Sequence, residues 1–139
     1  MSRVVVALGL VCASFAAAAQ SAMAQVQMAQ AQFPYERDLV LDARPMRGGK
    51  RVPILSIDSS GRAQIDLWCK RGRGEVVIAG DTITILVGAM REEACTAERA
   101  QADEDLIAAL GQVASWSQRG ATVTLSGGST TLRFRAAEN

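Results

Sequence analysis

The chain of 139 residues contains no histidine. Composition therefore excludes a histidine-based catalytic triad and a histidine metal site. Neither sign of charge is in large excess, because 15 basic and 14 acidic side chains give a formal net charge of +1. A chain so close to neutral lacks the basic field that favours nucleic acid. We expect no nucleic-acid partner, no metal and no other cofactor.

Long apolar runs are also scarce, and the clearest one lies at the N-terminus. The uncharged segment 4–19 follows the cation Arg3, and the small residues Ala22 and Ala24 come shortly after it. This run is too short and too rich in alanine for a membrane span, whereas the whole pattern is typical of a signal peptide. We expect residues 1–24 to be cleaved after Ala24, which predicts a periplasmic protein without a stable membrane span. Cleavage after Ala31 is the alternative.

Cysteine is rare, with three in the chain, and Cys12 falls inside the predicted signal peptide. The two that remain, Cys69 and Cys95, are an even number in an exported protein, which predicts a disulfide. The loop that it closes holds about 27 residues, which a chain-entropy model values at roughly 3–4 kcal/mol. Two buried thiols are the alternative. The wide spacing does not indicate a C-x-x-C redox motif.

The rest of the chain reads as short strands. The Gln/Ala-rich segment 25–34 predicts a flexible leader, so a single domain is expected over residues 35–139. Within it, alternating apolar segments are separated by glycine, proline and aspartate turns. The expected strands cover residues 38–43, 52–57, 62–69, 75–79, 82–87, 115–119, 121–126 and 130–135.

One segment has helical periodicity. Thr96 is suited to an N-cap, and apolar residues then recur at 106, 107, 110, 113 and 114. Asp103 and its acidic neighbours are expected on the solvated flank of this helix. Gly111 lies on the apolar side, so we expect the helix to approach the sheet closely there. The fold class predicted is α+β: a mostly antiparallel sheet of about eight short strands, curled or packed around one α-helix.

Several short motifs resemble the META domain family, the family of the bacterial heat-shock protein HslJ. The resemblance rests on segments 68–70, 80–85, 93–95, 105–110, 113–116 and 120–125, and it spans roughly residues 38–135. The family has glycine and asparagine around the first cysteine, where this chain has Trp68 and Lys70, and methionine where it has Glu93. The resemblance implies a small β-rich envelope protein. The family has no established catalytic activity, so the resemblance supplies no catalytic residues.

The most distinctive surface feature is the basic glycine segment 70–74, whose composition predicts a hairpin loop. Its cations Lys70, Arg71 and Arg73 are candidates for binding an anion through guanidinium forks and backbone N–H groups. Trp68 precedes them, and two placements stay open for it: under the helix or exposed as an anchor for a partner. A plain solvated basic loop is the alternative for the whole segment.

Two functions stay open at this point. The first is a non-enzymatic, monomeric periplasmic domain that binds an unknown envelope protein or small ligand, or supports the envelope under stress. The second is an anion or small-ligand carrier, or an inhibitor of an envelope enzyme, that uses Trp68 and the segment 70–73.

Overall fold

The computed structural model describes residues 32–138. The predicted signal peptide and residues 25–31 of the predicted leader lie outside the described residues. The elements are β1 (Asp38–Leu41), β2 (Ile54–Ile57), β3 (Arg62–Asp66), β4 (Arg71–Ala79), β5 (Thr82–Arg91), α1 (Ala97–Gln112), β6 (Ser115–Arg119), β7 (Thr122–Gly127) and β8 (Thr130–Ala136). The predicted α+β domain, with about eight strands and one helix, is confirmed.

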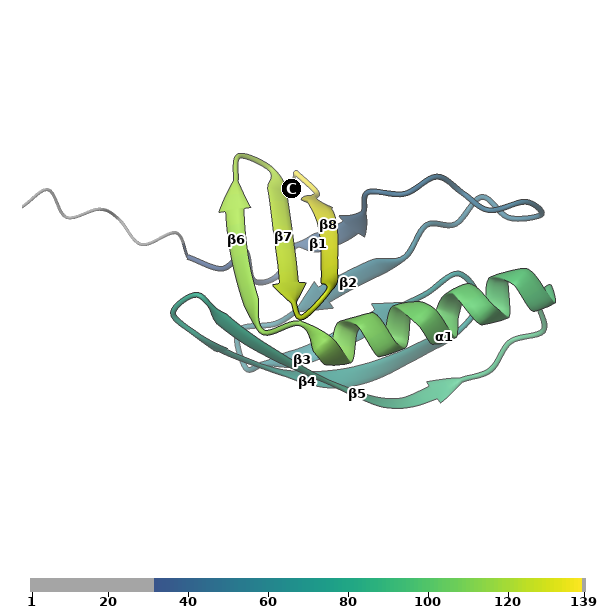
Figure 1. Ribbon diagram of the computed structural model, residues 1–139, viewed down its shortest axis with the longest axis horizontal. Helices are drawn as coiled ribbons and strands as arrows, with labels where there is room; N and C mark the ends of the chain where they lie inside the picture. The colour runs from purple at the N-terminus through teal and green to yellow at the C-terminus, as the bar shows by residue number, and fades with distance from the viewer. Residues whose placement is uncertain (1–31, 139) are drawn as a thin grey trace, which may run out of the picture.

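The eight strands form one antiparallel sheet in chain order, and the sheet closes because β1 also pairs with β8. Its thinnest junction is between β5 and β6, where Thr82 and Ser115 form the single aligned pair. Helix α1 lies along β5, and β6–β8 rise from its C-terminal end (Figure 1). The helix therefore covers the part of the molecule where the strand ladder between β5 and β6 stops.

Every strand contributes apolar side chains to a shared core, and Trp116 of β6 is buried in it. Phe33 is also buried, and its ring packs edge-on against Trp116 with 5.1 Å between centroids. The sequence placed Phe33 in the leader. Its burial shows that the packed domain begins at least two residues before Tyr35.

The helix begins as predicted, because the Thr96 hydroxyl accepts a hydrogen bond from the Arg99 amide. Leu106 and Leu110 are buried against the sheet. The predicted close approach at Gly111 is wrong, since nothing lies within 4 Å of a Cβ placed there. The close approach is at Gly127 of β7 instead, where a Cβ would meet the Gln112 carbonyl oxygen at 2.1 Å. Among the described residues, no helix has the length and apolarity needed to cross a membrane.

Strands β4 and β5 are longer than predicted. The segment 71–74, predicted as part of a loop, is the first part of β4, and β5 continues to Arg91 instead of ending at Val87. A Cβ on Gly72 or Gly74 would press on the backbone of β5, so both positions need glycine for close strand packing and are not turn residues. The register shifts between Gly72 and Gly74, which marks a bulge in this pair of strands.

Candidate functional site

The turn between β3 and β4 is held by one buried carboxylate. Asp103, on α1, has 0% of its surface exposed. Its two carboxylate oxygens accept hydrogen bonds from the backbone amides of Trp68, Cys69 and Lys70 at 2.7, 2.9 and 2.7 Å. Three donors satisfy a charge that would otherwise be costly to bury. The expectation of a solvated Asp103 is therefore wrong, and its carboxylate is occupied as a structural bridge between helix and sheet.

Two further links join the same turn to the start of the helix. Cys69 and Cys95 form a disulfide with 6.1 Å between their Cα atoms. The ammonium group of Lys70 donates a hydrogen bond to the carboxylate of Glu104 and lies 3.6 Å from that of Glu92. The hydrogen bond to Glu104 raises the pKa of Lys70 above its ordinary value of 10.5. Lys70 therefore belongs to the contacts that hold α1 against the turn.

The structure separates the four residues that were predicted to form one surface. Trp68 is buried, with 9% of its surface exposed, so it cannot serve as an exposed anchor. Lys70 lies beside the disulfide, in a hollow that Cys69 and Cys95 also line. Arg71 and Arg73 point outward from β4, where they are exposed. Only these two of the predicted set lie together on an accessible face.

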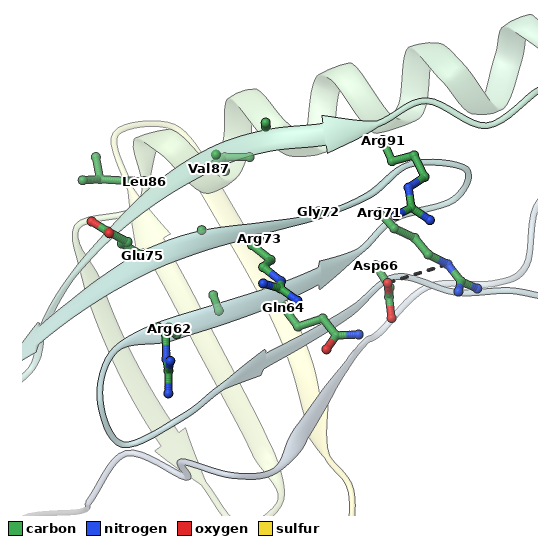
Figure 2. Close-up of a pocket in the computed structure, with 14 residues that line it drawn as sticks. Arg62, Gln64, Asp66, Arg71, Gly72, Arg73, Glu75, Leu86, Val87 and Arg91 are labelled. Carbon is green, nitrogen blue, oxygen red and sulfur yellow. Dashed lines mark ion pairs between the residues drawn. The ribbon is translucent and has the colours of Figure 1, made fainter.

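That face is a groove on the outer side of β3, β4 and β5, with a volume of about 850 Å³. Figure 2 shows its polar side chains standing on the three neighbouring strands. Four arginines line it, namely Arg62, Arg71, Arg73 and Arg91, and we call it the arginine groove. The lining also includes the carboxylates of Asp66 and Glu75 and the apolar residues Leu86 and Val87.

Carboxylates engage only part of this positive charge. Arg62 lies 3.1 Å from Asp58, and the Nε atom of Arg71 lies 3.8 Å from Asp66 (Figure 2). Within residues 32–138, neither Arg73 nor Arg91 has a carboxylate oxygen within 4.0 Å. The groove therefore presents guanidinium groups that can accept an anionic ligand from solution.

The acidic and hydroxyl groups next to the groove stabilise a turn. Asp58 accepts hydrogen bonds from the hydroxyl and amide of Ser60 and from Arg62, between β2 and β3. The hydroxyl of Ser60, followed by the amide of Arg62, lowers the pKa of Asp58 from 3.8 to about 2. These groups are arranged to fix the tight connection that ends at Gly61.

The sequence interpretation missed three residues of this region. Arg62 shares its face with Gln64 in the alternating pattern of β3, so its outward position could have been predicted. Arg91 was missed because the strand was expected to end at Val87. Asp103 is three residues before Leu106 and seven before Leu110, a spacing that places it on the apolar face of α1. That spacing could have predicted the burial of Asp103. Its charge led instead to the prediction of a solvated position.

Comparisons with known proteins agree with this fold. The model of the META domain family matches residues 29–139. A protein structure solved by NMR is similar to this chain with a TM-score of 0.54 and 17% sequence identity. The alignment covers 71% of this chain and 87% of that one, and at this identity it shows the fold alone. No curated protein matches the chain.

Proposed function

The chain belongs to the META domain family, and from this premise we propose that it is an exported, non-enzymatic domain of the bacterial envelope. It acts in the periplasm by binding a partner or a small ligand. The resemblance to a heat-shock protein family is the ground for placing this role in envelope stress. The arginine groove is the surface at which binding occurs.

The proposed export is supported by two features of the chain taken together. The N-terminal segment has the cation, the apolar run and the small residues of a signal peptide. The domain that follows contains the Cys69–Cys95 disulfide, a bond that persists in oxidising compartments and is rare in reducing ones. Each feature supports the other, because a disulfide is useful to a domain of this size only where it stays oxidised.

The surroundings of the titratable groups support a binding role over catalysis. Asp103 is saturated by three amide donors, and Asp58 is occupied by the turn that it stabilises. The chain has no histidine to act as a general base. The feature left for interaction is the arginine groove, which favours the binding of an anion and supports a ligand carrier as a second candidate function.

Cell fractionation tests the proposed export. The full chain carrying a C-terminal tag is expected in the periplasmic fraction. The matched control is the double variant Leu8→Arg, Leu10→Arg, which interrupts the apolar run and should keep the protein in the cytoplasm. If the parent chain stays in the cytoplasm, as the control variant does, the proposal is contradicted.

A further inference from the structure

The arginine groove contains a cross-strand pair of like charges. The register of β4 and β5 sets Arg71 directly opposite Arg91. Side chains that are direct partners in an antiparallel pair lie on the same face, and like charges in such pairs are destabilising. Arg71 forms an ion pair with Asp66 at 3.8 Å, whereas Arg91 pairs with no carboxylate in the described part of the chain. The two arginines are therefore compensated by one carboxylate, and the positive charge of Arg91 stays unpaired.

A third guanidinium group stands one step along the same face. Arg73 follows Arg71 at the spacing of two that keeps side chains on one side of a strand. Its neighbour across the groove is Gly88, at the bulge, where a Cβ would lie 2.7 Å from the Arg73 carbonyl oxygen. Glycine at this position places no side chain beside Arg73. Figure 2 shows both arginines on the open face of the sheet.

The charge of the groove selects the class of ligand. Asp58 pairs with Arg62, and Asp66 pairs with Arg71. Among the lining arginines, Arg73 and Arg91 are thus two positive charges that no carboxylate of residues 32–138 contacts. A phosphate monoester carries about −1.5 to −2 charges at pH 7, which matches these two charges, whereas a single carboxylate carries −1. Guanidinium forks also bind phosphate oxygens in a bidentate manner. The charge balance and the donor geometry therefore both favour a phosphate group.

The other end of the groove has an exposed leucine beside a carboxylate. Leu86 has 58% of its surface exposed and lies with Glu75 on the same row of the sheet, away from Arg91 (Figure 2). An exposed leucine at the end of a charged groove fits a ligand that has an apolar or neutral part beside its charged group.

We propose that the arginine groove binds a phosphate monoester group, held by Arg71, Arg73 and Arg91, with the rest of the ligand lying toward Leu86. The group belongs to a small phosphorylated molecule or to the headgroup of an anionic lipid. The proposal rests on the proposed function only in taking the domain to be a binding module. It makes no use of export, so either claim can fail while the other holds.

Titration of the protein purified from cells, whether or not its N-terminal segment has been cleaved, tests the proposal. The probes are inorganic phosphate, followed through backbone amide NMR signals, and phosphatidylcholine vesicles with and without phosphatidic acid, followed by sedimentation. Acetate at matched ionic strength is the control anion. Saturable binding of phosphate identifies a small soluble ligand, binding confined to phosphatidic acid vesicles identifies the lipid source, and both results support the site. The absence of saturable binding to either probe would overturn it.

Three substitutions separate a specific site from general charge attraction. Arg71→Ala and Arg91→Ala should each weaken binding at least about tenfold, the scale of one lost charge-assisted hydrogen bond. Arg133→Ala removes the same charge from the exposed face of β8 and should change binding less than about twofold. An equal loss in all three variants would show non-specific attraction and contradict the proposal.

A charge-reversal variant distinguishes a loss of the binding site from a loss of folding. Arg91→Glu replaces the like-charge pair with an opposite-charge pair across β4 and β5. We expect this variant to unfold at a higher temperature than the parent and to lose phosphate binding. A variant that is as stable as the parent or more so and still binds phosphate with unchanged affinity would refute the site.

Discussion

Asp103 is the residue on which the geometry around the disulfide most depends. Its buried carboxylate receives three consecutive amides, those of Trp68, Cys69 and Lys70, and so fixes the chain direction just before β4 begins. Because β4 carries Arg71 and Arg73, the same bridge sets where the arginine groove starts. A single charged residue on the helix thus positions a surface on the sheet.

Replacing Asp103 with alanine should therefore be strongly destabilising. The change leaves three amides without their acceptor, two of them belonging to the buried residues Trp68 and Cys69. We expect the free energy of unfolding to fall by about 3–5 kcal/mol, measured by chemical denaturation. Asp105→Ala is the matched control, since Asp105 is exposed and accepts one hydrogen bond from Gln101. Its cost should stay within about 0.5 kcal/mol. Similar costs for both variants would refute the structural role of Asp103.

The sequence could not reveal this role from residue type alone. Aspartate is almost never fully buried unless it is paired, so an aspartate among exposed acids was assigned to the solvated flank. Its partners are backbone amides some 35 residues away, and an amide has no signature in the sequence. Trp68 illustrates the same limit, since the alternating pattern of residues 62–69 left its exposure undecided, whereas the structure buries it in the turn after β3.

At the scale of elements, β4 and β5, two of the three strands that line the groove, were the least well predicted. Gly72 and Gly74 were taken as turn residues, but they face β5 where any side chain would clash. The helix was predicted better, because its N-cap and its leucines are local signals. Local patterns thus identified the elements, whereas contacts between elements determined where β4 begins and β5 ends.

Alanine substitutions at two glycines test the packing of the helix against the sheet. Gly127→Ala places a methyl group against the backbone at the end of α1 and should lower the free energy of unfolding by about 1–3 kcal/mol. Gly111→Ala fills open space within the helix and should raise it by up to about 1 kcal/mol. Thermal and chemical denaturation of both variants measure the difference. A stabilising effect at Gly127, or a loss at Gly111, would contradict the described packing.

At the scale of the whole molecule, three links tie α1 to the turn after β3: the disulfide, the Asp103 bridge and the Lys70–Glu104 ion pair. They lie close together because Cys69 and Lys70 are adjacent in the turn. The cysteine count predicted the first link, while the other two required the three-dimensional arrangement. The closure of the sheet by β1 and β8 also escaped the sequence pattern, because it joins segments from opposite ends of the domain.

The intact mass of the protein purified from cells shows whether the META domain is exported and oxidised. We expect the mass of residues 25–139, increasing by two hydrogens after reduction. Cys12 is then absent, and neither remaining cysteine reacts with an alkylating reagent until reductant is added. An uncleaved chain of 139 residues whose three cysteines all alkylate without reductant would contradict it.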